Sequence, residues 1–240
     1  MTDDPVVAYD QLALYYSHFS KRRSAYLRSV EKQISARIPK GAKSLLDIGA
    51  GDGSRAARIA SAAEIPRVLL LEPSAGMSSV TPANCEVWRM RAEDLNVDTV
   101  AERFDVITCL WNVLGHISGF ETRARALTAA AQLLSSAGLL FVDVIHRYNM
   151  RSYGATMTAA RWLRDRIAPG EGNGDVTARW STASGKVSTY GHVFTDPEMR
   201  RLADAAGLHC TARIVIDYDT GELRRSSWKG NLLYAFRRTS

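Results

Sequence analysis

Long hydrophobic runs are missing from this 240-residue chain. No stretch approaches the ~20 consecutive apolar residues that a helix needs to span a bilayer. The first residues, MTDDPVVAYDQLALYY, are acidic where a signal peptide would carry basic residues. We therefore expect a cytoplasmic protein with no membrane partner.

Cysteine is scarce as well. The three residues, Cys85, Cys109 and Cys210, are far apart and form no CxxC pair, which favours free thiols over a disulfide framework. The five histidines lack the spacing of metal ligands, so no metal site is predicted. Repeats are absent too, and a composition of 46% hydrophobic and 23% charged residues indicates one globular domain with a sizeable core.

The net charge of +6 raises the question of a nucleic-acid partner. Arginines cluster between residues 161 and 166, and again at 224–225 and 237–238. Acidic residues are interspersed, however, and no recognised nucleic-acid-binding module is visible. Solvated helix faces are the preferred interpretation of these clusters, and a docking patch for RNA is the alternative.

Short apolar runs alternate with helical stretches from residue 44 onward. The runs SLLDI, VLLLE, EVWRM, FDVITCL and GLLFVDV are typical of strands buried on both faces of a parallel sheet. A helical pattern precedes them at residues 9–38, with Leu27, Val30, Ile34 and Ile38 on one face.

The second half departs from this rhythm. Residues 150–194 combine a basic helical stretch with a predicted hairpin around the turn at 182–185. A capping box at 195–198 then opens a helix that ends at Gly207, and ARIVIDY and NLLYAF supply two last strands. We expect a doubly wound α/β fold with a mostly parallel seven-stranded sheet and an insertion after strand five. One domain, 1–240, would comprise a helical lid (1–40), a core (41–149), a cap (150–194) and a C-terminal part (195–240).

A glycine-rich turn joins the first strand to the following helix in the pattern Asp47-x-Gly49-x-Gly51-x-Gly53. Glycines there permit a tight turn and let a ligand press against the backbone. A dinucleotide turn would need its third glycine at position 54, where serine stands, so a small neutral cofactor tail fits better than a pyrophosphate. Glu72 ends the second strand, where a carboxylate can bind both ribose hydroxyls; a solvated acid is the alternative.

These segments resemble the successive motifs of class I S-adenosylmethionine-dependent methyltransferases. The resemblance rests on residues 47–53, 72–77 (Glu-Pro-Ser-x-x-Met), 91–95 and 104–110, and it covers about residues 9–150. It implies a Rossmann-like fold and S-adenosylmethionine as cofactor. Relatives often carry an acid where this chain has Arg91, and Met77 is equally interpreted as a core residue. The cofactor residues that the resemblance implies are Asp47, Gly49, Ala50, Gly51, Gly53, Glu72, Met77, Ala92, Glu93 and Leu110.

The stretch from Trp111 to Ile117 resembles small-molecule N-methyltransferases, which makes Trp111 a candidate for substrate binding. His116 within it is predicted to be a general base with an unperturbed pKa, the alternative being a cap of the following helix. Tyr16, on the lid, is expected to reach the cofactor's sulfonium or the acceptor, while Tyr9 and Tyr15 are expected to pack. Arg147 is a candidate for capturing a substrate carboxylate, with a surface arginine as the alternative.

The predicted function is therefore methyl transfer to an N or O atom of a small molecule, with nucleic acid not expected as a partner. Two patterns are absent: the Asn-Pro-Pro-Tyr run of amino-methylating nucleic-acid enzymes, and the acid-plus-lysine pattern of metal-dependent catechol enzymes. An RNA or protein methyltransferase, a non-catalytic cofactor-binding protein and, more distantly, a dinucleotide oxidoreductase are the alternatives. The acceptor and the oligomeric state are left open by the sequence.

Overall fold

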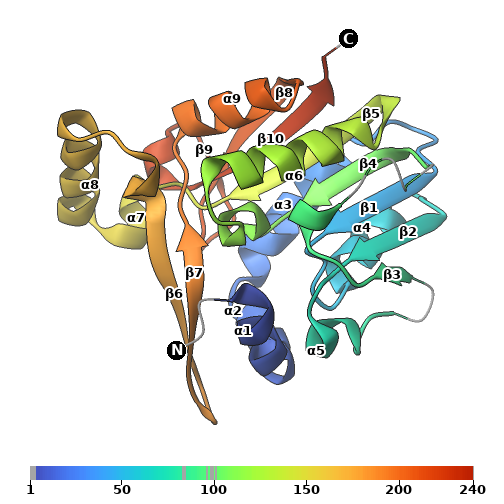
Figure 1. The fold of residues 1–240 in the computed structure, drawn as a ribbon, viewed down its shortest axis with the longest axis horizontal. Coiled ribbons are helices and arrows are strands. Elements are labelled where there is room, and N and C mark those ends of the chain that lie inside the picture. The colour runs from blue at the N-terminus through green and yellow to red at the C-terminus, as the bar shows by residue number, and fades with distance from the viewer. Residues whose placement is uncertain (1–3, 83–84, 96, 98–99, 101, 240) are drawn as a thin grey trace.

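An eight-stranded sheet with the strand order β3-β2-β1-β4-β5-β10-β8-β9 runs through the centre of the molecule (Figure 1). The computed structural model describes residues 4–82, 85–95, 97, 100 and 102–239. The strands are β1 (Ser44–Ile48), β2 (Arg67–Leu71), β3 (Glu86–Trp88), β4 (Phe104–Cys109), β5 (Leu134–Val144), β8 (Leu208–Ile216), β9 (Leu223–Arg224) and β10 (Asn231–Arg238).

The sheet is parallel from β3 to β5 and antiparallel from β5 to β9. The predicted doubly wound, mostly parallel α/β fold is thus confirmed, and all seven predicted strands form. The eighth strand, β9, was not predicted. It holds only two residues, paired with the end of β8, which is too short to leave a hydrophobic period in the sequence.

Alternating strand residues feed two hydrophobic cores, one on each face of the sheet. On one face, Leu45 packs with residues of α3 (Ser24–Ser35) and α4 (Ser54–Ala62). On the other, Leu46 packs with residues of α6 (Phe120–Gln132) and α9 (Asp196–Ala205). This covering of both faces is what the uniformly apolar strands require. Within the described part of the chain, the structure contains no helix long and apolar enough to cross a membrane.

The N-terminal helical segment is broken where a single helix was expected. It consists of α1 (Pro5–Leu12), a 3-10 turn (Ala13–Tyr15), α2 (Tyr16–Arg22) and α3. Leu27, Val30 and Ile34 share the buried face of α3, as their spacing predicts. The breaks let α1 turn away from α3 and lie over the carboxyl ends of the parallel strands, beside the hairpin (Figure 1).

The insertion contains α7 (Met150–Tyr153), α8 (Ala155–Ile167) and the predicted hairpin of β6 (Asp175–Thr182) and β7 (Gly185–His192). The hairpin forms its own two-stranded sheet and packs on α1, where Ala8 and Leu12 contact Val187. Lid and cap therefore meet above the edge of the main sheet where ligands bind in such folds.

The capping box predicted at the start of α9 is present. The Thr195 hydroxyl accepts a hydrogen bond from the Glu198 amide, and the Glu198 carboxylate accepts one from the Thr195 amide. Glu198 is 4% exposed, so its carboxylate also faces the interior.

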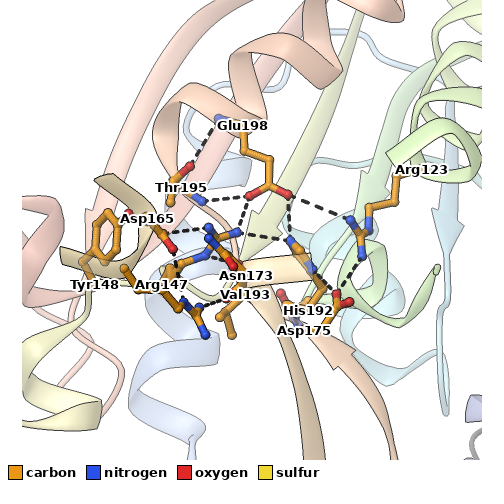
Figure 2. A network of polar contacts seen from close by, with 12 residues as sticks. Arg123, Arg147, Tyr148, Asp165, Asn173, Asp175, His192, Val193, Thr195 and Glu198 are labelled. Atoms are coloured by element: carbon orange, nitrogen blue, oxygen red, sulfur yellow. Dashed lines mark hydrogen bonds and ion pairs between the residues drawn. The ribbon is translucent and has the colours of Figure 1, made fainter. Parts of the chain in front are cut away.

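A network of five charged side chains and His192 joins the cap to the core (Figure 2). The Glu198 carboxylate lies 2.7 Å from both the Arg147 guanidinium and the imidazole of His192. The other His192 nitrogen lies 2.7 Å from Asp175, and the second arm of Arg147 lies 2.9 Å from Asp165. Arg123 of α6, 1% exposed, lies 3.9 Å from both Asp175 and Glu198. The network thus connects α8, both hairpin strands, α6 and α9 through charges that burial makes costly to leave unpaired.

Candidate active site

The turn between β1 and α4 is built on glycines with positive φ. Gly49, Gly51 and Gly53 have φ angles of 67°, 61° and 69°, which side-chain-bearing residues rarely adopt. At Gly51 a Cβ would also lie 3.1 Å from the Met77 methyl carbon and 3.3 Å from the Tyr16 hydroxyl. The turn therefore presents its backbone, with no side chains in the way, to the space above β1.

Glu72 follows β2 and faces the same space. Its two carboxylate oxygens accept hydrogen bonds from the backbone amides of Gly51 and Ser74, both at 2.8 Å. Only 6% of Glu72 is exposed, and this burial raises its pKa to about 7. Each oxygen keeps a further lone pair, so the carboxylate is able to accept from two neighbouring hydroxyls.

A cavity of about 750 Å³, counted to its open mouth, lies against the turn and Glu72. It is bounded by the lid, by the ends of β1, β2 and β4, and by the segment after β3. The predicted site residues that line it are Tyr16, Gly49, Gly51, Glu72, Met77, Ala92, Glu93, Leu110, Trp111 and His116. Met77, from α5 (Ala75–Ser78), is both 1% exposed and part of this wall, so the two interpretations of it are compatible.

Three other predicted residues lie behind this wall. Ala50 and Gly53 are buried within the turn and Asp47 is 0% exposed. One Asp47 oxygen accepts from the Thr108 hydroxyl at 2.6 Å, and the other has no partner among the described residues. Burial raises the pKa of Asp47. An unpaired acceptor beneath a bare glycine turn fits a ligand that brings a donor, as the methionine end of S-adenosylmethionine does.

Arg91, the departure from the family pattern, has a partner in the lid. Its guanidinium lies 2.7 Å from the carboxylate of Asp4, the residue that caps α1. This ion pair joins the lid to the rim of the cavity, which Pro5 and Val6 also line.

A second cavity of about 1080 Å³ adjoins the first and shares Tyr9, Tyr16, Trp111 and His116 with it. The Tyr16 and Trp111 rings are 5.7 Å apart at this junction. The remaining walls are mostly apolar and aromatic and come from the lid, the cap and the segments that follow β4, β5 and β8: Leu12, Phe19, Asn112, Ile145, Tyr153, Arg161, Val176, Thr177, Ala178, Trp180, Gly191, Val193 and Tyr218.

Both imidazole nitrogens of His116 are hydrogen-bonded. Nδ1 lies 2.9 Å from the Tyr190 carbonyl oxygen, so it carries the proton when the ring is neutral. Nε2 lies 3.0 Å from the Tyr9 hydroxyl and then accepts from it. Burial lowers the pKa of His116, so the expectation of an unperturbed value was wrong. The capping alternative is also wrong, because Gly119 is the N-cap of α6.

Tyr9 is a site residue that the sequence analysis missed. It packs as expected, 5.9 Å from the Trp180 ring, but it also lines both cavities and contacts His116. Its separation of seven residues from Tyr16, about two helical turns, was the available signal. Tyr15 lies apart from both cavities and contacts the Ser184 hydroxyl at 3.1 Å.

Trp111 and Asn112 follow β4 with φ angles of 57° and 65°, unusual for residues other than glycine. Asp143 compensates for this strain: its carboxylate accepts from the Trp111 amide at 3.0 Å and its carbonyl from the Asn112 amide at 2.9 Å. The indole N–H of Trp111 donates to the Tyr218 hydroxyl at 3.2 Å, which fixes the ring at the junction of the cavities.

The structure does not bring Arg147 to either cavity. Its guanidinium is occupied by Asp165, Glu198 and the Val193 carbonyl oxygen in the network of Figure 2. At 5% exposure it is not a surface arginine either, so that alternative was wrong. Each of its three nitrogens already has a partner and it lines neither cavity, so it is not placed to capture a substrate carboxylate there.

A family model described as a methyltransferase domain matches residues 18–213. The chain therefore belongs to the class I S-adenosylmethionine-dependent methyltransferases. It is an enzyme and S-adenosylmethionine is its cofactor, as the sequence motifs predicted. No match is found among curated proteins.

Solved structures share the fold at low sequence identity. The methyltransferase CcbJ from Streptomyces caelestis aligns with a TM-score of 0.66 and 15% identity over 88% of this chain and 90% of its own. The sugar N-methyltransferase KedS8 from Streptoalloteichus sp. ATCC 53650 gives 0.62 and 20% over 95% and 92%. The amino pentose methyltransferase CalS10 from Micromonospora echinaspora, with S-adenosylmethionine bound, gives 0.59 and 17% over 94% and 96%.

Proposed function

We propose that this methyltransferase moves the methyl group to an N or O atom of a small molecule bound in the second cavity. The observation that carries the proposal is the junction at which Tyr9, Tyr16, Trp111 and His116 line both cavities. A methyl group held at the end of the first cavity meets an acceptor in the second only there.

The second cavity supports a small acceptor. Its walls are mostly apolar and aromatic with a few polar side chains, as the walls of small-molecule sites usually are. Sugar N-methyltransferases are among the proteins that share this fold. The proposed division of the chain into lid, core, cap and C-terminal part agrees with this picture, because lid and cap supply most of the second cavity's walls.

In the first cavity, we assign Glu72 to the ribose hydroxyls, and Met77, Ala92 and Glu93 to the adenine. The bare turn of Gly49, Gly51 and their neighbours, with Leu110, would hold the methionine portion. Asp47 would act from beneath the turn. Apart from Asp47, which lies behind the wall, each named residue is assigned from its place along one continuous wall from the segment after β3 to the end of β4.

When bound, S-adenosylmethionine supplies a methyl group already activated by the sulfonium, so the protein has mainly to align it and remove a proton from the acceptor. Neutral His116 presents its Nε2 lone pair to the Tyr9 hydroxyl at 3.0 Å. An acceptor proton would pass to the Tyr9 oxygen as the Tyr9 proton moves to His116. Tyr16 and Trp111 would orient the acceptor against the methyl group.

Arg161 supports a role of the cap in binding rather than in docking RNA. It lines the second cavity, and its guanidinium lies 4.1 Å from the centre of the Tyr153 ring. The positive charge at this end of the arginine cluster is therefore directed toward the cavity.

A methyl-transfer screen of metabolite pools with isotopically labelled cofactor tests the proposal. We expect label in a small organic acceptor and none in RNA or protein offered in parallel. Label in RNA or protein alone would overturn the small-molecule proposal while leaving the methyltransferase assignment intact.

A pair of variants then tests the two-cavity arrangement with the acceptor so found. Tyr153→Ala alters only the second cavity and should raise KM for the acceptor while the cofactor's Kd stays within about threefold. Glu72→Ala should leave the acceptor's KM nearly unchanged and weaken cofactor binding by ~1–3 kcal/mol. Identical effects of both changes on both ligands would contradict separate sites.

A further inference from the structure

Arg55 is a buried cation, and two of its nitrogens have no hydrogen-bond partner in the part of the chain that the structure describes. It is the second residue of α4, directly after the glycine turn, and it is 6% exposed. Its Nε and Nη1 have no hydrogen-bond partner among the described residues, although the side chain lines the first cavity. Leaving charged donors buried and unpaired costs several kcal/mol in general. An arginine in this place therefore indicates a ligand that supplies the missing hydrogen-bond acceptors.

The charges around Arg55 hold it ionised. Burial acts to lower its pKa, but the neighbouring acidic groups, among them Asp47, Asp143 and Glu31, outweigh burial and raise the pKa above its ordinary value. No ion pair of 4.0 Å or less joins Arg55 to any of them among the described residues. The surroundings therefore keep the positive charge without occupying its donors.

Asp47 is the counterpart of Arg55 beneath the same turn. Its second oxygen is an unpaired acceptor with respect to the described residues, just as two Arg55 nitrogens are unpaired donors. A ligand that carries an ammonium and a carboxylate on one carbon supplies what both lack. Of the parts of S-adenosylmethionine, only the amino-acid end has this pair of charges.

We propose that Arg55 binds the α-carboxylate of the cofactor's methionine portion and that the protein thereby selects cofactors that retain this carboxylate. The guanidinium is a donor fork that matches a carboxylate, and the charge-assisted bonds form in a site shielded from water. The inference concerns the cofactor alone and does not depend on which acceptor is methylated.

Calorimetric titration of three ligands tests the proposal: S-adenosylhomocysteine, decarboxylated S-adenosylmethionine and 5′-methylthioadenosine, which lacks the amino-acid end. For Arg55→Met we expect about 10- to 100-fold weaker binding of S-adenosylhomocysteine, from the usual worth of a charged hydrogen bond. Binding of the other two ligands should change by less than about threefold. Arg55→Lys should recover part of the loss.

Arg58→Met is the matched control. Arg58 lies one turn further along α4, its side chain is 54% exposed, and it pairs with Glu31 outside the cavity. Its replacement should leave all three affinities unchanged.

The melting temperature of the unliganded variants separates binding from structure. Because Arg55 lacks partners for two of its nitrogens, Arg55→Met should leave the melting temperature unchanged or raise it, whereas a structural arginine would lower it.

Equal losses for S-adenosylhomocysteine and 5′-methylthioadenosine, or no loss for either, would overturn the assignment of Arg55. In wild-type protein, equal affinity for S-adenosylmethionine and its decarboxylated form would overturn it without any variant. Failure of wild-type protein to bind S-adenosylhomocysteine at all would instead contradict the cofactor itself.

Discussion

Replacing Glu72 by glutamine should change how the stability of the unliganded protein depends on pH. Burial raises the pKa of this carboxyl from 4.5 to about 7, even though two backbone amides donate to it. The folded state therefore binds the proton more tightly than the unfolded chain. For an acid with a raised folded pKa, the ionised form opposes folding, so stability falls as pH rises through this interval.

The size of the effect follows from the two pKa values. The interval from 4.5 to about 7 corresponds to about 3 kcal/mol. The unfolding free energy of the wild type should lose this amount, relative to Glu72→Gln, between about pH 4.5 and pH 7, and the difference should then stay constant. Because Glu72 is only 6% exposed, solvent screening removes little of it.

Urea unfolding of both proteins at half-unit intervals from pH 4.5 to pH 8 measures this difference. The glutamine keeps one acceptor for the Gly51 or Ser74 amide but sets an NH₂ group against the other. This adds a cost that is the same at every pH, so the change of the difference with pH is diagnostic and its absolute value is not. Glu171→Gln, at an exposed position, controls for the loss of a charge.

If the unfolding free energies of wild type and Glu72→Gln changed with pH in parallel, the raised pKa of the buried Glu72 carboxyl would be refuted. The cofactor provides a second readout, because ribose hydroxyls donate to the ionised carboxylate. Affinity for S-adenosylhomocysteine should therefore rise with pH up to about 7 in the wild type and be weak and flat in the variant.

Three further expectations concern the site and the cap. His116→Asn should leave cofactor affinity unchanged and lower turnover by ~10²-fold or more, since it removes the base; near-wild-type single-turnover rates would exclude that role. Gly51→Ala should weaken cofactor binding by at least about tenfold in calorimetry, because its φ of 61° disfavours a Cβ and the methyl group would press on Met77 and Tyr16. Mixed RNA at low salt should show no tight binding in a gel-shift titration, and steeply salt-dependent binding would favour the RNA alternative.

The parallel part of the sheet was predictable because burial on both faces leaves a direct mark in the sequence. The residues Leu45 to Ile48 and Val68 to Leu71 are buried throughout, as uniformly apolar runs indicate. The breaks in the lid were not predictable in this way. They depend on contacts such as that between Tyr9 and Trp180, which are 171 positions apart in the sequence. Helical periodicity carries no information about contacts between residues so far apart.

The same distinction separates the predicted site residues that the structure brings to the cavities from those that it does not. Glu72 and the glycine turn lie on short motifs whose chemistry is local, and the cavity forms against them. Arg147 lies away from both cavities because it pairs with Asp165 and Glu198, which reach it only through the folded cap and α9. Arg55 had no local signal to distinguish it from ordinary helix residues, and the signal for Tyr9 was only its separation of seven residues from Tyr16.

The charged network has a consequence for exchanging caps between related enzymes. A hairpin transplanted without Asp175 and His192 would leave Arg123, 1% exposed, with Glu198 as its remaining counter-charge in a site built for more. In the proposed function this hairpin contacts the acceptor, and the side chains that pair with its Asp175 and His192 lie on α6 and α9. On that proposal a functional chimera must carry those positions along with the hairpin, so the transferable unit is larger than the segment that contacts the acceptor.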